Sequence, residues 1–181
     1  MQSTTHLEDD HKLILRSLHI LDEMTLRVEH GQRLNAKDAE GIVQFLKGFA
    51  DRFHQGKEEG VLFPALLQDP TQIHHMDLAA DIFQHDRQRS LIDGLEESVR
   101  TGNSREFVYF SRRLSHFFRD HIQDEEQNLF ELMNSALTPE EDRAVNAGMH
   151  NYDFHWQNEN LSRLIQGLMD LETEYLPRFA A

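Results

Sequence analysis

The sequence contains no cysteine, and this absence excludes several kinds of site at once. Without thiols the chain can form no disulfide, no thiolate zinc site, no iron–sulfur cluster and no thiol nucleophile. Basic residues are also few: 18 lysines and arginines stand against 32 aspartates and glutamates, a formal net charge of −14. Because such a charge repels phosphate backbones and anionic lipids, we expect no nucleic-acid partner and no membrane partner.

Long apolar segments are missing as well. No apolar run approaches the roughly 18–20 residues that cross a bilayer, and the first residues lack the basic and apolar regions of a signal peptide. We therefore expect a cytoplasmic protein. A length of 181 residues suits a single domain spanning 1–181. Histidine, by contrast, is frequent: twelve occur, which directs attention to metals and protons.

The spacing of apolar residues predicts an all-α protein. Proline (four) and glycine (nine) are scarce, and apolar residues recur every three or four positions. We predict four helices. The first spans about 5–30, the third about 73–100 and the fourth about 103–133. The second starts after Asn35 and is kinked or ended locally by Pro64. Short links between them favour an up-down-up-down four-helix bundle over about 5–134. A C-terminal helical region at about 138–177, with a break expected near Gly148, would pack across the bundle or mediate dimerisation.

Local signals mark the helix ends. Gly31 and Gly102 are placed to stop the first and third helices, and Asn35 and Asn103 can cap the helices that follow them. Asp69-Pro70 breaks the chain between the second and third helices, and Thr138-Pro139 starts the C-terminal region. The inward faces of the first and third helices are predicted to carry Leu7, Ile14, Leu15, Leu18, Leu21 and Leu26, and Leu78, Ile82, Phe83, Leu91, Ile92 and Leu95.

An internal repeat carries the chemical signal. Residues 54–63 and 121–130 both read H-x-x-x-E-E-x-x-L-F, at an offset of 67 residues. The spacing puts His54 one helical turn from Glu58, and His121 one turn from Glu125, on faces that also carry phenylalanine and leucine. Burying a histidine beside a carboxylate is costly unless the two are paired or bind a metal. H-x-x-x-E alone is weak evidence because it occurs four times in the chain, but the ten-residue repeat is much stronger.

The first and third helices each offer one inward histidine. His11 lies among Leu7 and Ile14, and His85 lies among Leu78 and Ile92. A lone histidine on an apolar face is more often a core residue than a ligand. Two of them on alternate helices, in the order H … HxxxE … H … HxxxE, favour ligands instead. The predicted metal ligands are His11, His54, Glu58, His85, His121 and Glu125.

This pattern resembles the hemerythrin-like, or HHE cation-binding, family, over residues from about 7 to 134. The resemblance implies four terminal histidine ligands and two carboxylates, Glu58 and Glu125, that bridge two iron ions, with an oxo or hydroxo bridge. Oxygen carriers of the superfamily have a fifth histidine and an Asp/Glu bridging pair, within HxxxH and HxxxxD segments. Here His85 is followed four residues later by Arg89, so the chain is similar to the four-histidine, two-glutamate bacterial type.

The ligand types suit iron or manganese, whereas Ca²⁺ and Mg²⁺ would want oxygen ligands throughout. With four histidines each metal would keep about one open position, where O₂, peroxide or nitric oxide could bind. His19, His30, His116 or a tyrosine could instead fill a position. We expect Arg89 on the surface in a salt bridge, Glu59 and Glu126 beside the site without being ligands, and His6 in a frayed N-terminus. His74, His75, His150 and His155 are expected on the surface.

Three functions stay open. The first is a di-iron protein that binds or reacts with O₂, peroxide or nitric oxide, as an enzyme or a sensor. The second is a ferritin-like oxidase or iron store, which is weaker because E-x-x-H occurs only at Glu8/His11. The third is a structural metal site without redox chemistry, whose C-terminal helices form a dimer or bind a partner. Whether the chain is a monomer or a homodimer is also open.

Overall fold

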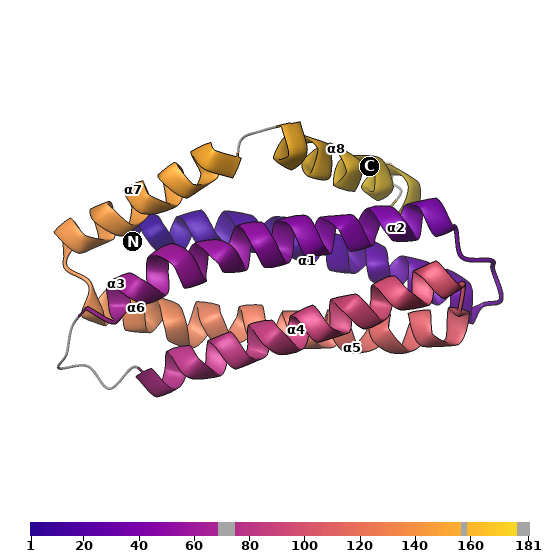
Figure 1. The fold of residues 1–181 in the computed structure, drawn as a ribbon, viewed down its shortest axis with the longest axis horizontal. Coiled ribbons are helices and arrows are strands. Elements are labelled where there is room, and N and C mark those ends of the chain that lie inside the picture. Colours follow the sequence, from indigo (N-terminus) through magenta and orange to yellow (C-terminus); the bar gives the residue numbers. More distant parts are fainter. Residues whose placement is uncertain (69–74, 157–158, 177–181) are drawn as a thin grey trace, which may run out of the picture.

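The computed structural model of the chain describes residues 1–68, 75–156 and 159–176, and every regular element in this part is a helix. Four helical segments lie side by side in an up-down-up-down bundle (Figure 1). The first is α1 (Gln2–Glu29), and the third is α4 (His75–Thr101). The second consists of α2 (Ala36–Phe45), η1 (Leu46–Gln55), η2 (Glu58–Leu62) and α3 (Phe63–Leu66). The fourth consists of α5 (Ser104–Asp124), η3 (Glu125–Leu129) and α6 (Phe130–Ala136). The predicted fold class is confirmed.

Most helix ends follow the predicted signals. The Asn35 side chain accepts hydrogen bonds from the Lys37 and Asp38 amides, and Asn103 accepts one from the Glu106 amide. Gly31 and Gly102 adopt φ values of 82° and 65°, the left-handed conformation in which glycine ends a helix without steric cost. The break predicted at Asp69-Pro70, and His74 with it, lies outside the described residues.

Pro64 does not end its helix. Its position in the first turn of α3 needs no amide hydrogen, so the chain stays helical through it to Leu66.

The start of α1 differs from the prediction. The helix begins at Gln2, because the carboxylate of Asp142, from the C-terminal region, accepts hydrogen bonds from the Gln2 and Ser3 amides at 3.1 and 3.2 Å. A carboxylate at this end also complements the helix dipole. His6 therefore lies within an ordered helix, and the prediction of a frayed terminus there was wrong.

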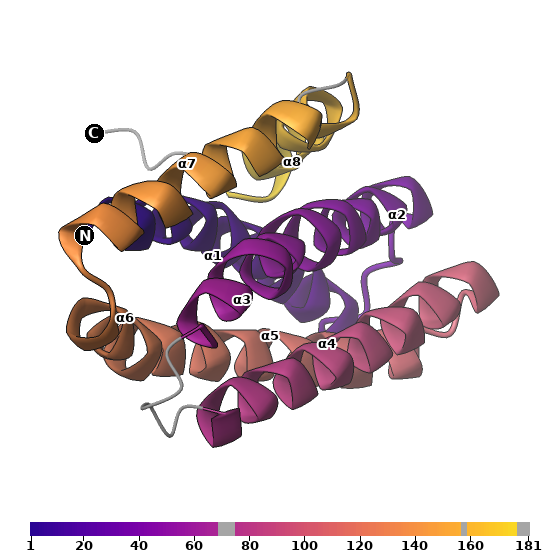
Figure 2. The ribbon, with the colours of Figure 1, turned by 60° about the vertical axis from the view of Figure 1, so that its left-hand side comes forward.

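The C-terminal region forms α7 (Pro139–Trp156) and α8 (Glu159–Tyr175), which pack across one side of the bundle. α7 contacts α1 and η2, while α8 contacts α1, α2 and η1 (Figure 2). The break predicted near Gly148 was wrong, since α7 continues through it. A Cβ atom at Gly148 would lie 2.8 Å from Val61 Cγ1, so this glycine allows close approach of α7 to η2.

The core consists of two apolar clusters, one toward each end of the bundle. Leu7 belongs to one cluster and Ile14 to the other, so that position 11 lies at their junction. Three predicted core residues are instead exposed: Leu26 (39%), Ile82 (43%) and Phe83 (66%). α7 and α8 pack on the α1–α2 side, so the outer face of α4 stays uncovered. No described helix is long and apolar enough to cross a membrane.

Gly94 sets the approach of α4 to α5. A Cβ atom at this position would lie 2.3–2.7 Å from three ring atoms of Phe110. We expect Gly94→Ala to lower the free energy of unfolding by about 1–3 kcal/mol, the usual cost of overpacking. Gly167→Ala is the matched control, because no atom lies within 4 Å of its Cβ position. It should raise stability by up to about 1 kcal/mol through helix propensity. Urea unfolding measures both, and equal effects would contradict this packing role.

Candidate metal centre

The fold brings together the six predicted ligands, one or two from each bundle helix. His11 comes from α1, His54 and Glu58 from η1 and η2, His85 from α4, and His121 and Glu125 from α5 and η3. Each is at most 2% exposed. They lie where the two apolar clusters meet, so water has little access to them.

The ligating atoms form two groups that share a carboxylate. In one group, atoms of His11, His54, Glu58 and Glu125 all lie within 4.8 Å of one another; in the other, atoms of His85, His121 and Glu125 do. Glu58 also approaches the second group, with Oε2 3.4 Å from His85 Nε2. The imidazole rings are inclined at 70° in the His11–His54 pair and at 88° in the His85–His121 pair, with centroids 4.8 and 5.0 Å apart. The arrangement thus forms two overlapping groups of candidate ligand atoms that share Glu125.

Unsatisfied polar atoms are concentrated at this place. Among the described residues, twelve buried side-chain nitrogen or oxygen atoms lack a hydrogen-bond partner, and eight of them belong to these six residues. They are the Nε2 atoms of all four histidines and both carboxylate oxygens of Glu58 and Glu125. Since buried polar atoms are almost always satisfied, such a cluster requires an explanation, and cations between these atoms provide one.

The other ring nitrogen of each histidine is held by the protein. Nδ1 of His11 contacts Glu126 at 2.9 Å, and Nδ1 of His85 contacts Glu59 at 2.7 Å. The remaining two Nδ1 contacts are His54 to Asp10 at 3.3 Å and His121 to Gln84 at 3.0 Å. A partner at Nδ1 fixes the ring so that Nε2 points to the centre, as metal-binding histidines usually require.

These contacts account for the whole internal repeat. The second glutamate of each copy, Glu59 or Glu126, supports the lone histidine of another helix. The phenylalanine that ends each copy stacks on the same ring: Phe63 on His85 and Phe130 on His11, with centroids 6.0 and 5.9 Å apart. Each copy therefore supplies two candidate ligands and also orients a third. The expectation that Glu59 and Glu126 lie beside the site is confirmed.

The backbone around the repeat is π-helical, which the sequence did not predict. Glu58 and Glu125 are the first residues of two five-residue π-helical segments, η2 and η3. Such wider turns are rare and concentrate at functional sites. In each segment the first glutamate of the pair reaches the centre, while the second contacts the histidine of a neighbouring helix.

The electrostatics of the six groups favour bound cations. Burial and the charge of Glu125 raise the pKa of Glu58 well above its usual value. Burial would also raise the pKa of Glu125, but His121, His11 and His85 outweigh it and lower that pKa. Burial lowers the pKa of His11, yet Glu125 and the other nearby carboxylates raise it to about 9. Ionising both of these neighbouring carboxylates is energetically unfavourable unless positive charge lies between them.

A buried lysine connects the centre to α7. Lys57 is fully buried, and its Nζ atom lies 2.7 Å from Asp10 and 2.9 Å from Asp153 of α7. It also lies 3.1 Å from His6 Nε2. His6, Asp153 and His150 form a further group of metal-ligating types, but the ammonium of Lys57 already neutralises its carboxylate. We interpret this group as the outer end of a salt-bridge network that holds Asp10 against His54.

Sequence reasoning missed Asp10, Gln84 and Lys57. The sequence does contain a pattern that could have indicated Asp10 and Gln84. Each of these polar residues directly precedes one of the two lone histidines, His11 and His85. Arg89 lies partly on the surface as expected, bonded to Asp51 and Asp86, but it also contacts Glu59 at 2.6 Å and so reaches the support of His85.

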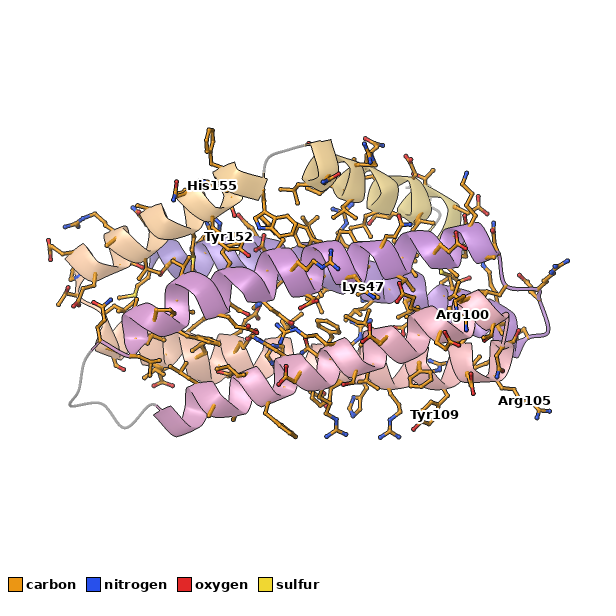
Figure 3. The ribbon with its side chains drawn as sticks, viewed as in Figure 1. Lys47, Arg100, Arg105, Tyr109, Tyr152 and His155 are labelled. Atoms are coloured by element: carbon orange, nitrogen blue, oxygen red, sulfur yellow. The ribbon has the colours of Figure 1, made fainter. Side chains whose placement is uncertain are left out.

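The other candidate histidines lie away from the centre. His19, His30, His116, His150 and His155 are exposed, and the side chain of His75 lies outside the described part. The buried hydroxyl of Tyr175 bonds Asp38, and Tyr152 on the inner side of α7 donates to the Arg52 carbonyl at 2.9 Å (Figure 3). Among the described residues no fifth histidine joins the six side chains, and the three tyrosines lie elsewhere, with Tyr109 exposed.

The fold and the centre together define a cation-binding four-helix bundle. The family model of the hemerythrin HHE cation-binding domain matches residues 2–133, and the chain belongs to this family. The match covers all four bundle helices and ends before α7 and α8. Searches of curated proteins and of solved structures returned no match.

Lys57 and Lys47 form a natural comparison, since each contacts two carboxylates. Lys57 is buried, whereas the Lys47 side chain is 28% exposed between η1 and α4, where it contacts Asp93 and Glu96 (Figure 3). We expect Lys57→Met to cost about 3–5 kcal/mol of unfolding free energy, because Asp10 would stay buried without its cation. Lys47→Met should cost no more than about 1 kcal/mol. Chemical denaturation measures both, and similar costs would contradict the network.

Proposed function

We propose that the chain binds two iron ions through His11, His54, Glu58, His85, His121 and Glu125, and uses them to bind or react with O₂, peroxide or nitric oxide. The observation that carries the proposal is the cluster of eight buried, unsatisfied nitrogen and oxygen atoms on these six residues. The family gives the cation-binding property, and the two overlapping groups of ligating atoms support a count of two. With these six residues as ligands, the chain would be of the four-histidine, two-glutamate bacterial type of the family.

The donor set fits iron. Imidazole nitrogen with carboxylate oxygen suits iron, while the lack of thiolate disfavours sites that select zinc or copper(I) through sulfur. His11 and His54 would hold one ion, His85 and His121 the other, and Glu58 and Glu125 would bridge them. When bound, the iron pair supplies the electrons and the open coordination positions for a small oxygen- or nitrogen-containing ligand.

The protein itself orients the ligands and packs apolar rings against two of them. Asp10, Glu59, Gln84 and Glu126 each hold one histidine ring in place, so that binding requires little rearrangement. Phe63 and Phe130 cover the outer faces of two rings and keep the surroundings apolar. An iron store or a structural metal site is the alternative. The absence of a fifth histidine or tyrosine among the described residues near the centre favours reactivity, because positions on the metals would stay open.

Metal content tests the ligand assignment. Protein loaded with Fe(II) without oxygen should contain two irons per chain, whereas His54→Ala and His121→Ala should each lose bound iron. These variants should also be less stable, because a buried glutamate would be left beside an incomplete site. His155→Ala is the matched control: the residue is exposed on α7 and should not affect metal content. Full occupancy in both ligand variants would refute the assignment.

Reactivity is tested separately from binding. The absorption spectrum of the iron-loaded protein should change when O₂, peroxide or nitric oxide is added. Protein loaded with Zn(II) should show no such change, because zinc has no redox chemistry. If none of the three ligands alters the spectrum of the iron-loaded protein, the proposed reactivity is wrong and the storage or structural role is correct.

A further inference from the structure

The two halves of the centre are related by an internal pseudo-symmetry. The repeat relates His54 to His121 at an offset of 67 residues, and an offset of 74 residues relates His11 on α1 to His85 on α4. The supporting contacts obey the same relation: Asp10 corresponds to Gln84, and Glu59 to Glu126. Differences between corresponding positions therefore show where the two halves of the centre are built differently.

On the side of the first repeat the approach to the centre is closed. Leu7 is fully buried, Lys57 is fully buried in its salt bridges, and Val61 lies under Gly148 of α7. α7 packs over this side along α1 and η2. Among the described residues, these side chains and α7 cover the centre from this side, and the ammonium of Lys57 would repel an approaching cation.

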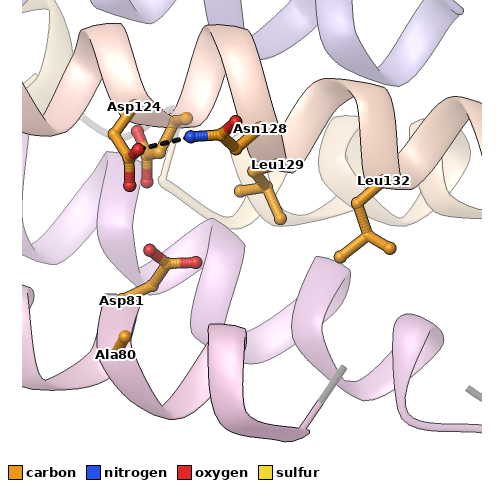
Figure 4. Close-up of a pocket in the computed structure, with 7 residues that line it drawn as sticks. Ala80, Asp81, Asp124, Asn128, Leu129 and Leu132 are labelled. Atoms are coloured by element: carbon orange, nitrogen blue, oxygen red, sulfur yellow. Dashed lines mark hydrogen bonds between the residues drawn. The ribbon is translucent and has the colours of Figure 1, made fainter. Parts of the chain in front are cut away.

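The corresponding positions on the other side are Asp81, Asp124 and Asn128, and all three line a cavity of about 420 Å³. A buried leucine, a lysine and a valine are thus replaced by two carboxylates and an amide. α7 makes no comparable contact with α4 or η3. Figure 4 shows the Asp81 carboxylate of α4 directed across the cavity toward Asp124.

The cavity reaches the centre through Glu125. This carboxylate is 1% exposed, lines the cavity, and has no hydrogen-bond partner on either oxygen. Ala80, Asp124 and Asn128 are exposed at the mouth, whereas Asp81 is only 7% exposed. Among the described residues no basic side chain forms an ion pair with Asp81, and burial together with Glu125 raises its pKa to about 6. A divalent cation would relieve the repulsion between these carboxylates.

We propose that this cavity is the route by which divalent metal ions enter the centre, and that Asp81 and Asp124 bind the ion before it passes to Glu125. The inference rests on the proposed function, because it assumes a metal centre behind Glu125. It adds a transient cation site outside the six ligands. The proposal also gives α7 a role. α7 covers the centre on the side of the first repeat, so metal ions would enter from the acidic cavity on the other side.

The rate of loading tests the carboxylates. Metal-free protein is mixed with Co(II) in a stopped-flow instrument, and uptake is followed by the ligand-field absorption of bound cobalt. Asp81→Asn and Asp124→Asn should load more slowly, by roughly ten-fold in view of the usual size of electrostatic steering, and still reach the wild-type stoichiometry. Asp120→Asn is the matched control, since Asp120 is an exposed residue of α5 that does not line the cavity.

A second pair of variants tests the route without changing charge. Ala80→Trp should obstruct the mouth and slow both Co(II) uptake and its removal by a chelator. Ala79→Trp, at the neighbouring exposed position outside the cavity lining, should leave both rates unchanged. Both alanines are exposed on α4, so neither change should disturb the core.

The outcomes separate the two proposals. Wild-type loading rates in the Asp81, Asp124 and Ala80 variants, with full stoichiometry, would overturn the entry route and leave the metal centre intact. A lower final stoichiometry in Asp81→Asn would also overturn it, because Asp81 would then be a ligand of the resident metal. A wild-type protein that takes up no Co(II) and no Fe(II) would refute the metal centre itself.

Discussion

The bundle buries two glutamate side chains next to each other, and many of the surrounding contacts compensate for their charge. Glu58 and Glu125 lie at the junction of the two apolar clusters, and neither carboxylate has a hydrogen-bond partner. Each contacts histidine Nε2 atoms at 3.1–3.5 Å, yet two carboxylates buried this close together are costly without further positive charge. The four histidines around the pair bring eight such atoms to one place, and cations between them would satisfy all eight. The proposed metal centre would therefore stabilise the middle of the bundle.

The surrounding side chains form a second layer of polar contacts that the internal repeat organises. Each copy provides a histidine and a glutamate to the centre, and its second glutamate and its phenylalanine orient a histidine of another helix. Departures from this symmetry are as informative as the symmetry itself. Asp10 replaces the neutral Gln84, and this extra buried charge is matched by Lys57, which in turn pairs with Asp153 of α7. α7, which lies beyond the family match, is in this way connected to the centre by two ion pairs.

Much of this could be predicted from the sequence, for identifiable reasons. Regular apolar spacing and local caps such as Asn35 and Gly31 predict the four helices, because these signals depend on neighbouring residues. The repeat and the two lone histidines predicted which six side chains meet. Features that depend on distant contacts were not predictable. Asp142 extends α1 to Gln2, Lys57 is buried through residues from α1 and α7, and the π-helical turns at Glu58 and Glu125 arise only when the helices pack. Ile82 and Phe83 follow the helical pattern yet are exposed, because α7 and α8 cover the opposite side.

The most direct test of the central claim is anomalous X-ray diffraction at the iron edge from crystals of the iron-loaded protein. We expect two peaks about 3.5–4 Å apart, the usual separation in two-metal sites, between the Glu58 and Glu125 carboxylates. Nε2 of His11 and His54 should coordinate one peak, and Nε2 of His85 and His121 the other. A single peak, or peaks only at the His6, His150 and Asp153 group, would contradict it.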